Sequence, residues 1–263
     1  MISIAPTITT DDSVVYKRQI EKLSRFAVRV HIDLADGEFA PTKLTPIDEV
    51  WWPGNMQADV HVMFANPFEH IEAFIAMHPE LVIVHAEAEG DFITFAEKLH
   101  AHGIKVGVAL LPLTSAETIV PALEHIDHVL IFGGKLGYQG GKADLKNLKK
   151  VLVLRKHKPQ LEIGWDGGIN NTNVARLVAG GIDVLNVGGY IAKAVNPLAA
   201  YVTLQALAVM TEKRLDERDR KKEKRKKQKI VKEPKQSKKS IKSNKKSTPN
   251  EHSGSRTKSQ SNT

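Results

Sequence analysis

The alternation of short apolar runs with longer amphipathic segments is the feature that most restricts how this chain can fold. Eight runs rich in Val, Ile and Leu recur along the first 189 residues, and segments with helical spacing of apolar residues lie between them. The runs span residues 2–5, 27–34, 58–64, 81–86, 105–111, 128–132, 161–166 and 183–189. Strands that alternate with helices pair in parallel, and eight such repeats in about 200 residues match a compact (β/α)8 TIM barrel of the α/β class.

The segments between the runs carry helix signals. Residues 66–78 place Phe68, Ile71 and Ile75 at helical spacing, and residues 170–181 open with Asn and close with two Gly residues. The competing fold, an open doubly wound sheet, would need a Gly-rich turn after its first strand. Residues 5–12 contain no Gly, so we expect a closed barrel.

The charge is concentrated at one end of the chain. Residues 211–263 hold 20 Lys and Arg against 7 Asp and Glu, whereas residues 1–210 hold 18 against 23. We therefore expect a mildly acidic barrel over residues 1–210 and a Lys-rich extension over residues 211–263. The first part of that extension is rich in helix formers. Beyond Pro234 almost nothing is apolar, which predicts disorder.

The basic extension has two readings. It is either a solvated tail or an arm that contacts nucleic acid or another polyanion through salt-sensitive attraction. No aromatic residues interleave its lysines, so we expect no sequence specificity. Apolar helix faces on the barrel could also support a homo-oligomer, although no subunit number is indicated.

The composition narrows the chemistry and the location. The chain has no Cys, which excludes disulfides, thiolate metal ligands and a Cys nucleophile. No charged segment followed by a long apolar run opens the chain, and no apolar stretch has the length of a membrane span. We expect a cytoplasmic protein without a membrane span.

Polar side chains stand where several of the runs end. His31 and Asp33 share one face of the second run, His61 ends the third and Asp166 ends the seventh. A single strand His is more often a core residue than a ligand. Four such groups on one rim favour a metal site, because buried carboxylates without a partner are costly. The set suits one divalent ion such as Zn, Fe, Mn or Co. His85, which ends the fourth run, either supports this site or fills the core.

Glycine pairs follow the last three runs. Glycine lets backbone N–H groups approach an anion, and a phosphate site near the last strands recurs in this barrel. The pairs favour a phosphorylated substrate, and they are Gly140 and Gly141, Gly167 and Gly168, and Gly188 and Gly189.

These motifs resemble the ribulose-phosphate 3-epimerase family of the ribulose-phosphate-binding barrel superfamily over residues 2 to about 207. The family's H-x-D-x-M-D-G-x-F-x-P run is matched by residues 31–41, and its D-V-H-L-M run by residues 59–63. Its H-x-E motif corresponds to His85-Ala-Glu87, its V-D-G-G-I motif to residues 165–169, and its S-P-S-I start to Ala5-Pro6-Thr7-Ile8.

The resemblance implies an isomerase of the pentose phosphate pathway that converts D-ribulose 5-phosphate to D-xylulose 5-phosphate. A metal would polarise the C2 carbonyl and stabilise the enediolate, while one aspartate removes the C3 proton and a second returns a proton to the other face. By position, Asp33 and Asp166 would be these catalytic acids. His31, Asp33, His61 and Asp166 would hold the metal, and Thr7 and the six glycines above would contact substrate and phosphate.

Departures from the family pattern lie in the loops that would bind phosphate and in the apolar layer above the metal. The family's M-x-V-N-P-G-F-G-G-Q loop is replaced by residues 132–141, which lack Asn-Pro and carry Lys135. Ala35 replaces a Met, and Gly189 stands where relatives often have Ser.

Two alternatives remain beside the epimerase. A decarboxylase or aldolase of the same superfamily would carry D-x-K-x-x-D on the third run, but His61 stands at the Lys position. The other is a diverged, inactive barrel that binds sugar phosphate and acts through the basic tail.

Overall fold

The computed structural model describes residues 2–240, with side chains described through residue 228. The chain divides into two compact units, Met1–Leu215 and Asp216–Thr263. The prediction of disorder beyond Pro234 is wrong for residues 235–240, which continue the last helix, and residues from 241 onward lie outside the described residues.

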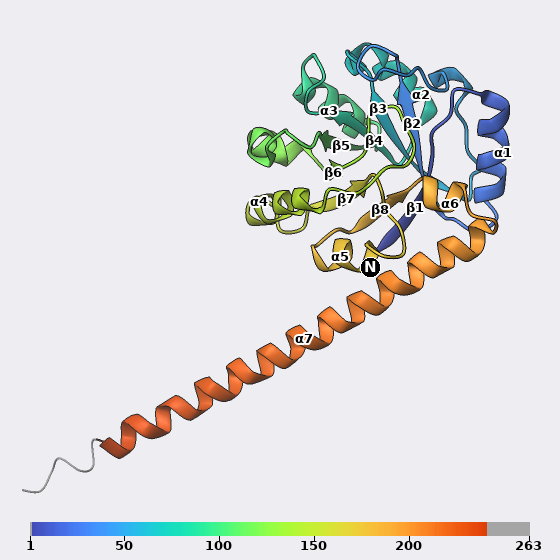
Figure 1. Cartoon of the computed structure of the whole chain (residues 1–263). Coiled ribbons are helices and arrows are strands. Elements are labelled where there is room, and N and C mark those ends of the chain that lie inside the picture. The colour runs from blue at the N-terminus through green and yellow to red at the C-terminus, as the bar shows by residue number, and fades with distance from the viewer. Residues whose placement is uncertain (1, 241–263) are drawn as a thin grey trace, which may run out of the picture. The chain divides into compact units, whose positions relative to one another are not determined.

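Eight parallel strands close into a barrel in sequence order, with β1 hydrogen-bonded to β8 (Figure 1). This confirms the predicted (β/α)8 fold. Each strand falls on one of the eight apolar runs, and the strands are β1 (Ser3–Ile8), β2 (Arg29–Ala35), β3 (Gln57–Met63), β4 (Leu81–His85), β5 (Lys105–Leu110), β6 (His128–Phe132), β7 (Glu162–Asp166) and β8 (Val184–Val187).

Helices connect the strands and surround the barrel (Figure 1). The α-helices are α1 (Ser13–Leu23), α2 (Ile71–Met77), α3 (Phe92–Ala101), α4 (Lys149–His157), α5 (Val174–Ala179), α6 (Gly189–Ala192) and α7 (Pro197–Ser240). Short 3₁₀ helices are η1 (Ile47–Glu49), η2 (Pro67–His70), η3 (Ala116–His125) and η4 (Leu145–Leu148).

Two connections differ from regular α-helices for a local reason. The predicted helix of residues 66–78 is divided into η2 and α2, and Pro67 stands at the start of η2. The connection between β5 and β6 is the 3₁₀ segment η3, which contains Pro121. Proline lacks the N–H that an interior α-helical turn needs, so it favours an irregular or shorter helical segment.

The main core lies between the outer faces of the strands and the surrounding helices, and the part of α7 that belongs to the first unit contributes Tyr201, Leu204 and Ala208 to it. Inside the barrel, a small apolar layer is made of Leu81, Ile83, Ala109 and Leu130. At the carboxyl ends, polar side chains point inward from several strands, beside the apolar Met63 and Phe132, and they form the site described below.

The amino end of the barrel interior holds a charged network. Arg29 donates to both carboxylate oxygens of Glu162 at 2.9 Å and to Asp59 at 2.7 Å. His128 Nδ1 lies 2.7 Å from the second Glu162 oxygen. Asp59 is fully buried, so Arg29 supplies the counter-charge that its carboxylate requires.

Among the described residues, no helix is long and apolar enough to cross a membrane.

Candidate functional site

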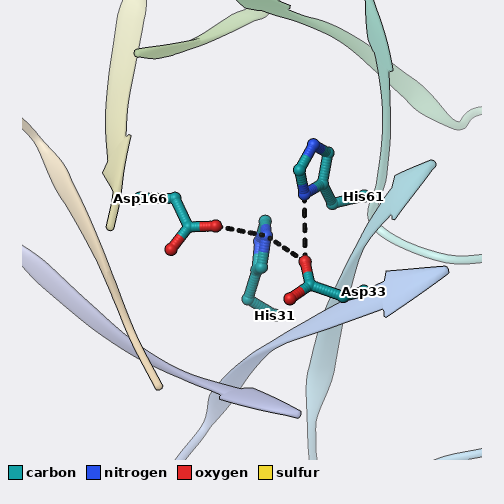
Figure 2. Close-up of side chains that lie close together, drawn as sticks. All are labelled: His31, Asp33, His61 and Asp166. Atoms are coloured by element: carbon teal, nitrogen blue, oxygen red, sulfur yellow. Dashed lines mark hydrogen bonds and ion pairs between the residues drawn. The ribbon is translucent and has the colours of Figure 1, made fainter. Parts of the chain in front are cut away.

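Four side chains from three strands meet inside the carboxyl end of the barrel (Figure 2). His31 and Asp33 lie two residues apart on β2, where strand alternation turns both inward. His61 comes from β3 and Asp166 from the end of β7. One ligand atom from each of the four lies within 4.8 Å of the others. The structure therefore brings together all four residues predicted as metal ligands.

Asp33 is the most heavily contacted member of this group. Its Oδ1 lies 3.0 Å from His61 Nδ1 and 3.4 Å from His31 Nε2. Its other oxygen accepts a hydrogen bond of 2.6 Å from the Thr9 hydroxyl. Asp166 approaches from β7, and its Oδ2 lies 4.0 Å from the same His31 nitrogen (Figure 2). Both carboxylates are thus aimed at one point beside His31.

A polar chain continues behind His61. His61 Nε2 lies 2.9 Å from His85 Nε2, and His85 Nδ1 lies 3.4 Å from Glu87. Glu87 in turn accepts hydrogen bonds from the Leu111 backbone and the Thr114 hydroxyl. Of the two readings left open for His85, the structure supports the one in which this side chain contacts the site, because it fixes the ring of His61.

Burial and neighbouring charges shift the pKa values of these groups in opposite directions. Burial and the nearby Asp33 carboxylate raise the pKa of Asp166. Burial also opposes ionisation of Asp33, but hydrogen bonds and charge from His31 and His61 hold its pKa well below its usual value. Burial lowers the pKa of His61 to about 4, despite its contact with Asp33. Two close, buried carboxylates therefore differ in how readily they ionise.

The donor set fits a divalent metal ion. His31 is fully buried; its Nδ1 has no hydrogen-bond partner among the described residues, and its Nε2 makes only the longer ion-pair contacts with Asp33 and Asp166. A buried imidazole nitrogen that faces two carboxylates from beyond normal hydrogen-bonding distance is typical of a metal ligand. The four residues can hold a metal through two imidazoles and two carboxylates, a ligand set that suits Zn, Fe, Mn or Co.

A pocket of about 240 Å³ opens directly above these side chains. Asp33 and Asp166 line its floor, whereas His31 and His61 do not belong to its lining. Every residue predicted to contact substrate or phosphate lines it, namely Thr7, Gly140, Gly141, Gly167, Gly168, Gly188 and Gly189. The pocket thus joins the acids to the three glycine loops.

The glycines after β7 also have a packing role. Gly167 and Gly168 have positive φ angles of 109° and 68°. A side chain at Gly167 would place its Cβ 2.3 Å from the Gly134 nitrogen, and one at Gly168 would lie 2.2 Å from the Ala143 nitrogen. Both positions therefore require glycine even without a ligand, because the loop after β6 lies directly against them.

The altered loop after β6 is folded over the pocket. Gln139 donates to the Thr7 carbonyl at 3.3 Å, and the Thr42 hydroxyl donates to the Gly137 carbonyl at 2.7 Å. Lys135, expected near the mouth, lines the pocket with its Nζ 4.2 Å from the centre of the Tyr138 ring. The loop keeps a defined position without the Asn-Pro of the family motif.

Sequence reasoning missed three residues of this site. Thr9 could have been found, because it lies two residues after Thr7, just beyond the end of β1, where continued alternation places it on the same face. Asn186 carried a weaker signal, as the polar residue within the last apolar run. Lys193 gave no signal. It lines the pocket with its Nζ 3.9 Å from where a Gly140 Cβ would lie.

Comparison with solved structures supports the fold. The barrel is similar to 3-hexulose-6-phosphate synthase from Salmonella typhimurium, with a TM-score of 0.59 and 14% identity, covering 80% of this chain and 100% of that one. It is similar to KGPDC from Streptococcus mutans, also with a TM-score of 0.59, at 10% identity over 80% of this chain and 98% of that one. At such identities the likeness concerns the fold alone.

Comparison of the sequence with those of known proteins identifies the family, which the structural comparison does not. Residues 3–192 match the ribulose-phosphate 3 epimerase family. Ribulose-phosphate 3-epimerase from Helicobacter pylori is 30% identical over 197 residues, which cover 72% of this chain and 90% of that protein. The protein of that name from Bacillus subtilis is 29% identical over 197 residues, covering 72% and 91%. This chain therefore belongs to the ribulose-phosphate 3-epimerase family and is an enzyme of the isomerase class.

Proposed function

We propose that this enzyme inverts C3 of a ketose phosphate, with D-ribulose 5-phosphate and D-xylulose 5-phosphate as its substrate pair. The observation that carries the proposal is the meeting of Asp33 and Asp166 at one point on the pocket floor. Inversion at carbon needs one group to remove a proton and another to deliver one to the opposite face. Two carboxylates that enter from different strands meet this requirement.

A divalent metal ion, such as Zn, Fe, Mn or Co, would be held by His31, Asp33, His61 and Asp166. When bound, it would withdraw electrons from the ketose carbonyl and so acidify the neighbouring C3–H bond. The protein itself holds the metal-binding side chains in a defined orientation. Thr9 holds Asp33 and His85 holds His61, so neither side chain needs to reorganise during the reaction.

The two aspartates would carry the proton transfer. One ionised carboxylate takes the C3 proton, and the other, protonated, delivers its proton to the opposite face of C3. The overall proton count is unchanged, since the pair begins and ends with one proton. Burial and mutual repulsion favour this state, because two close carboxylates in a buried site do not both ionise easily without a cation.

The far side of the pocket would bind the phosphate. The glycine loops after β6, β7 and β8 line that side, where their backbone N–H groups would donate to the phosphate, and Lys193 adds a positive charge. A dianionic group is stabilised by such donors. The same pocket thus offers acids for the reacting carbon and an anion site for the substrate's far end.

The test is proton exchange at C3. Metal-loaded enzyme is incubated with D-ribulose 5-phosphate in deuterated water, and NMR follows deuterium entry at C3 and formation of D-xylulose 5-phosphate. Enzyme stripped with a chelator and then reloaded with each metal shows whether activity depends on the ion. Exchange with epimer formation supports the proposal. Binding of the sugar phosphate without exchange would instead support the diverged, non-catalytic barrel.

We further propose that the basic tail contacts nucleic acid or another polyanion independently of catalysis. Two features of the tail support this proposal. Every side chain from Asp216 to Gln228 is exposed, and residues 211–263 carry a net positive charge. Deleting residues 212–263 is expected to leave epimerase activity intact and to remove salt-sensitive retention on heparin. Loss of activity in the deletion would show that the tail belongs to the site.

A further inference from the structure

Asn186 is a buried polar residue for which the reaction proposed above has no use. It is one of two buried asparagines among the described residues, and it is 1% exposed. The other, Asn147, donates to the Asp144 carbonyl at 3.3 Å. Neither amide atom of Asn186 has a hydrogen-bond partner in the described part of the chain. A buried amide with an unpaired donor and an unpaired acceptor is unfavourable, and such groups call for a specific explanation.

The barrel register gives Asn186 a defined neighbourhood. It pairs with Asp166 on β7 and with Ala5 on β1. Thr7, the next residue of β1 on the same face, lies one step closer to the mouth. The Thr7 hydroxyl is also buried without a partner. Asn186 and Thr7 both line the pocket, so three unpaired polar atoms of these residues adjoin the substrate space.

The position of Asn186 along the substrate path follows from the same register. On one side it adjoins Asp166, the proposed acid for C3. On the other it stands two residues before Gly188, which follows β8 at the proposed phosphate end. Its amide therefore lies between the group that acts on the reacting carbon and the glycines that would receive the phosphate.

We propose that Asn186 and Thr7 together recognise a hydroxyl of the sugar chain between the reacting carbon and the phosphate. The inference rests on the proposed epimerase function. An amide offers both a donor and an acceptor, and a threonine hydroxyl offers the same, so the pair can satisfy a hydroxyl in both of its roles. In a pentulose 5-phosphate this hydroxyl is the one on C4. The enzyme then selects ketose phosphates hydroxylated at C4 over their 4-deoxy analogues.

A site built around a substrate hydroxyl discriminates strongly against an analogue that lacks it, because the site's polar groups are then left unpaired. The test compares D-ribulose 5-phosphate with its 4-deoxy analogue in the wild type, Asn186→Ala and Thr7→Val. We expect kcat/KM for D-ribulose 5-phosphate to fall about 10- to 100-fold in each variant. For the 4-deoxy analogue the variants are expected to match the wild type within about threefold.

Asn147→Ala is the matched control, since it removes a buried amide away from the pocket and should leave the preference between the two substrates unchanged. Equal losses with both substrates in Asn186→Ala would overturn the proposal and indicate that Asn186 positions Asp166. No loss with either substrate would overturn it as well.

Two further measurements keep the outcome interpretable. Asn186→Val removes the unpaired amide, and we expect the ligand-free variant to melt about 2–4 °C above the wild type.

If the wild type turns over neither compound, the proposed reaction fails. Calorimetric binding of the same two compounds to the wild type and Asn186→Ala then decides the hydroxyl assignment separately. The proposal is supported if the wild type binds D-ribulose 5-phosphate more tightly than the 4-deoxy analogue and Asn186→Ala does not. It is overturned if each protein binds the two compounds equally well.

Discussion

The carboxylates of Asp33 and Asp166 approach the same atom, Nε2 of His31, to 3.4 and 4.0 Å. They arrive from β2 and β7, strands separated by more than a hundred residues in the sequence. Both aspartates are buried beneath the pocket. Such an arrangement concentrates negative charge where water is scarce, so it favours a bound cation, a shared proton, or both.

The two aspartates should divide the reaction between them. We expect Asp33→Asn and Asp166→Asn each to lower epimerisation by about 10²- to 10⁴-fold, since each variant lacks one of the two proton carriers. Each variant should still exchange the C3 proton for deuterium faster with one epimer than with the other, as followed by NMR. The metal content of each variant is measured in parallel. Exposed Asp48→Asn serves as the control and should keep full activity. Near-normal turnover in either site variant would contradict the two-acid mechanism.

Lys193 should contribute to substrate binding rather than to the chemical step. Its ammonium group lies beside Gly140 at the proposed phosphate end. We expect Lys193→Met to raise KM for D-ribulose 5-phosphate about tenfold with little change in kcat. Because salt screens such attraction, KM should rise with ionic strength more steeply in the wild type than in the variant. Lys156→Met, on an exposed face of α4, should behave as the wild type. A loss confined to kcat would contradict this role.

Arg29 should be important for stability. Its guanidinium group contacts Asp59, whose side chain is fully buried, and burial raises the pKa of Asp59 although Arg29 lowers it. We expect Arg29→Met to reduce the free energy of unfolding by about 3–5 kcal/mol, because a buried carboxylate loses its partner. Adding Asp59→Leu to that variant should restore part of the loss, as measured by urea unfolding. No recovery in the double variant would mean that packing of the Arg29 side chain, rather than charge, accounts for the effect.

Glu162 should make the barrel sensitive to acid. Burial opposes its ionisation, but hydrogen bonds from His128 and Arg29 hold its pKa well below the usual value for a glutamate. The folded state therefore binds fewer protons here than the unfolded state as the pH falls below the ordinary glutamate pKa of about 4.3. The stabilisation is present above that pH and is lost as acid protonates Glu162. Urea unfolding between about pH 5 and pH 3 should show a shallower loss in Glu162→Gln than in the wild type. Parallel profiles would contradict the assignment.

The order of the barrel elements follows from local pattern alone. All eight strands fall on runs that were recognisable by their Val, Ile and Leu content, and the carboxyl halves of β2, β3, β4 and β7 place polar residues at the rim. His31 and Asp33 could be assigned to one face because strand alternation has a period of two residues. The strand-end positions of His61 and Asp166 grouped them with this pair, and the motifs shared with the ribulose-phosphate 3-epimerase family then implied the roles of the four residues.

Contacts between distant segments were decided only by barrel closure. Some contacts join parts of the chain whose sequence patterns do not indicate that they meet. Examples are Arg29 with Glu162, Lys193 with Gly140, and Gly167 with Gly134. Whether a buried polar residue has a hydrogen-bond partner also depends on the tertiary structure. Asn147 and Asn186 are both buried asparagines, yet one has a partner and the other adjoins the pocket without one. A local pattern reports the face on which a side chain lies, whereas its partners depend on which other strands and loops the closed barrel brings within hydrogen-bonding distance.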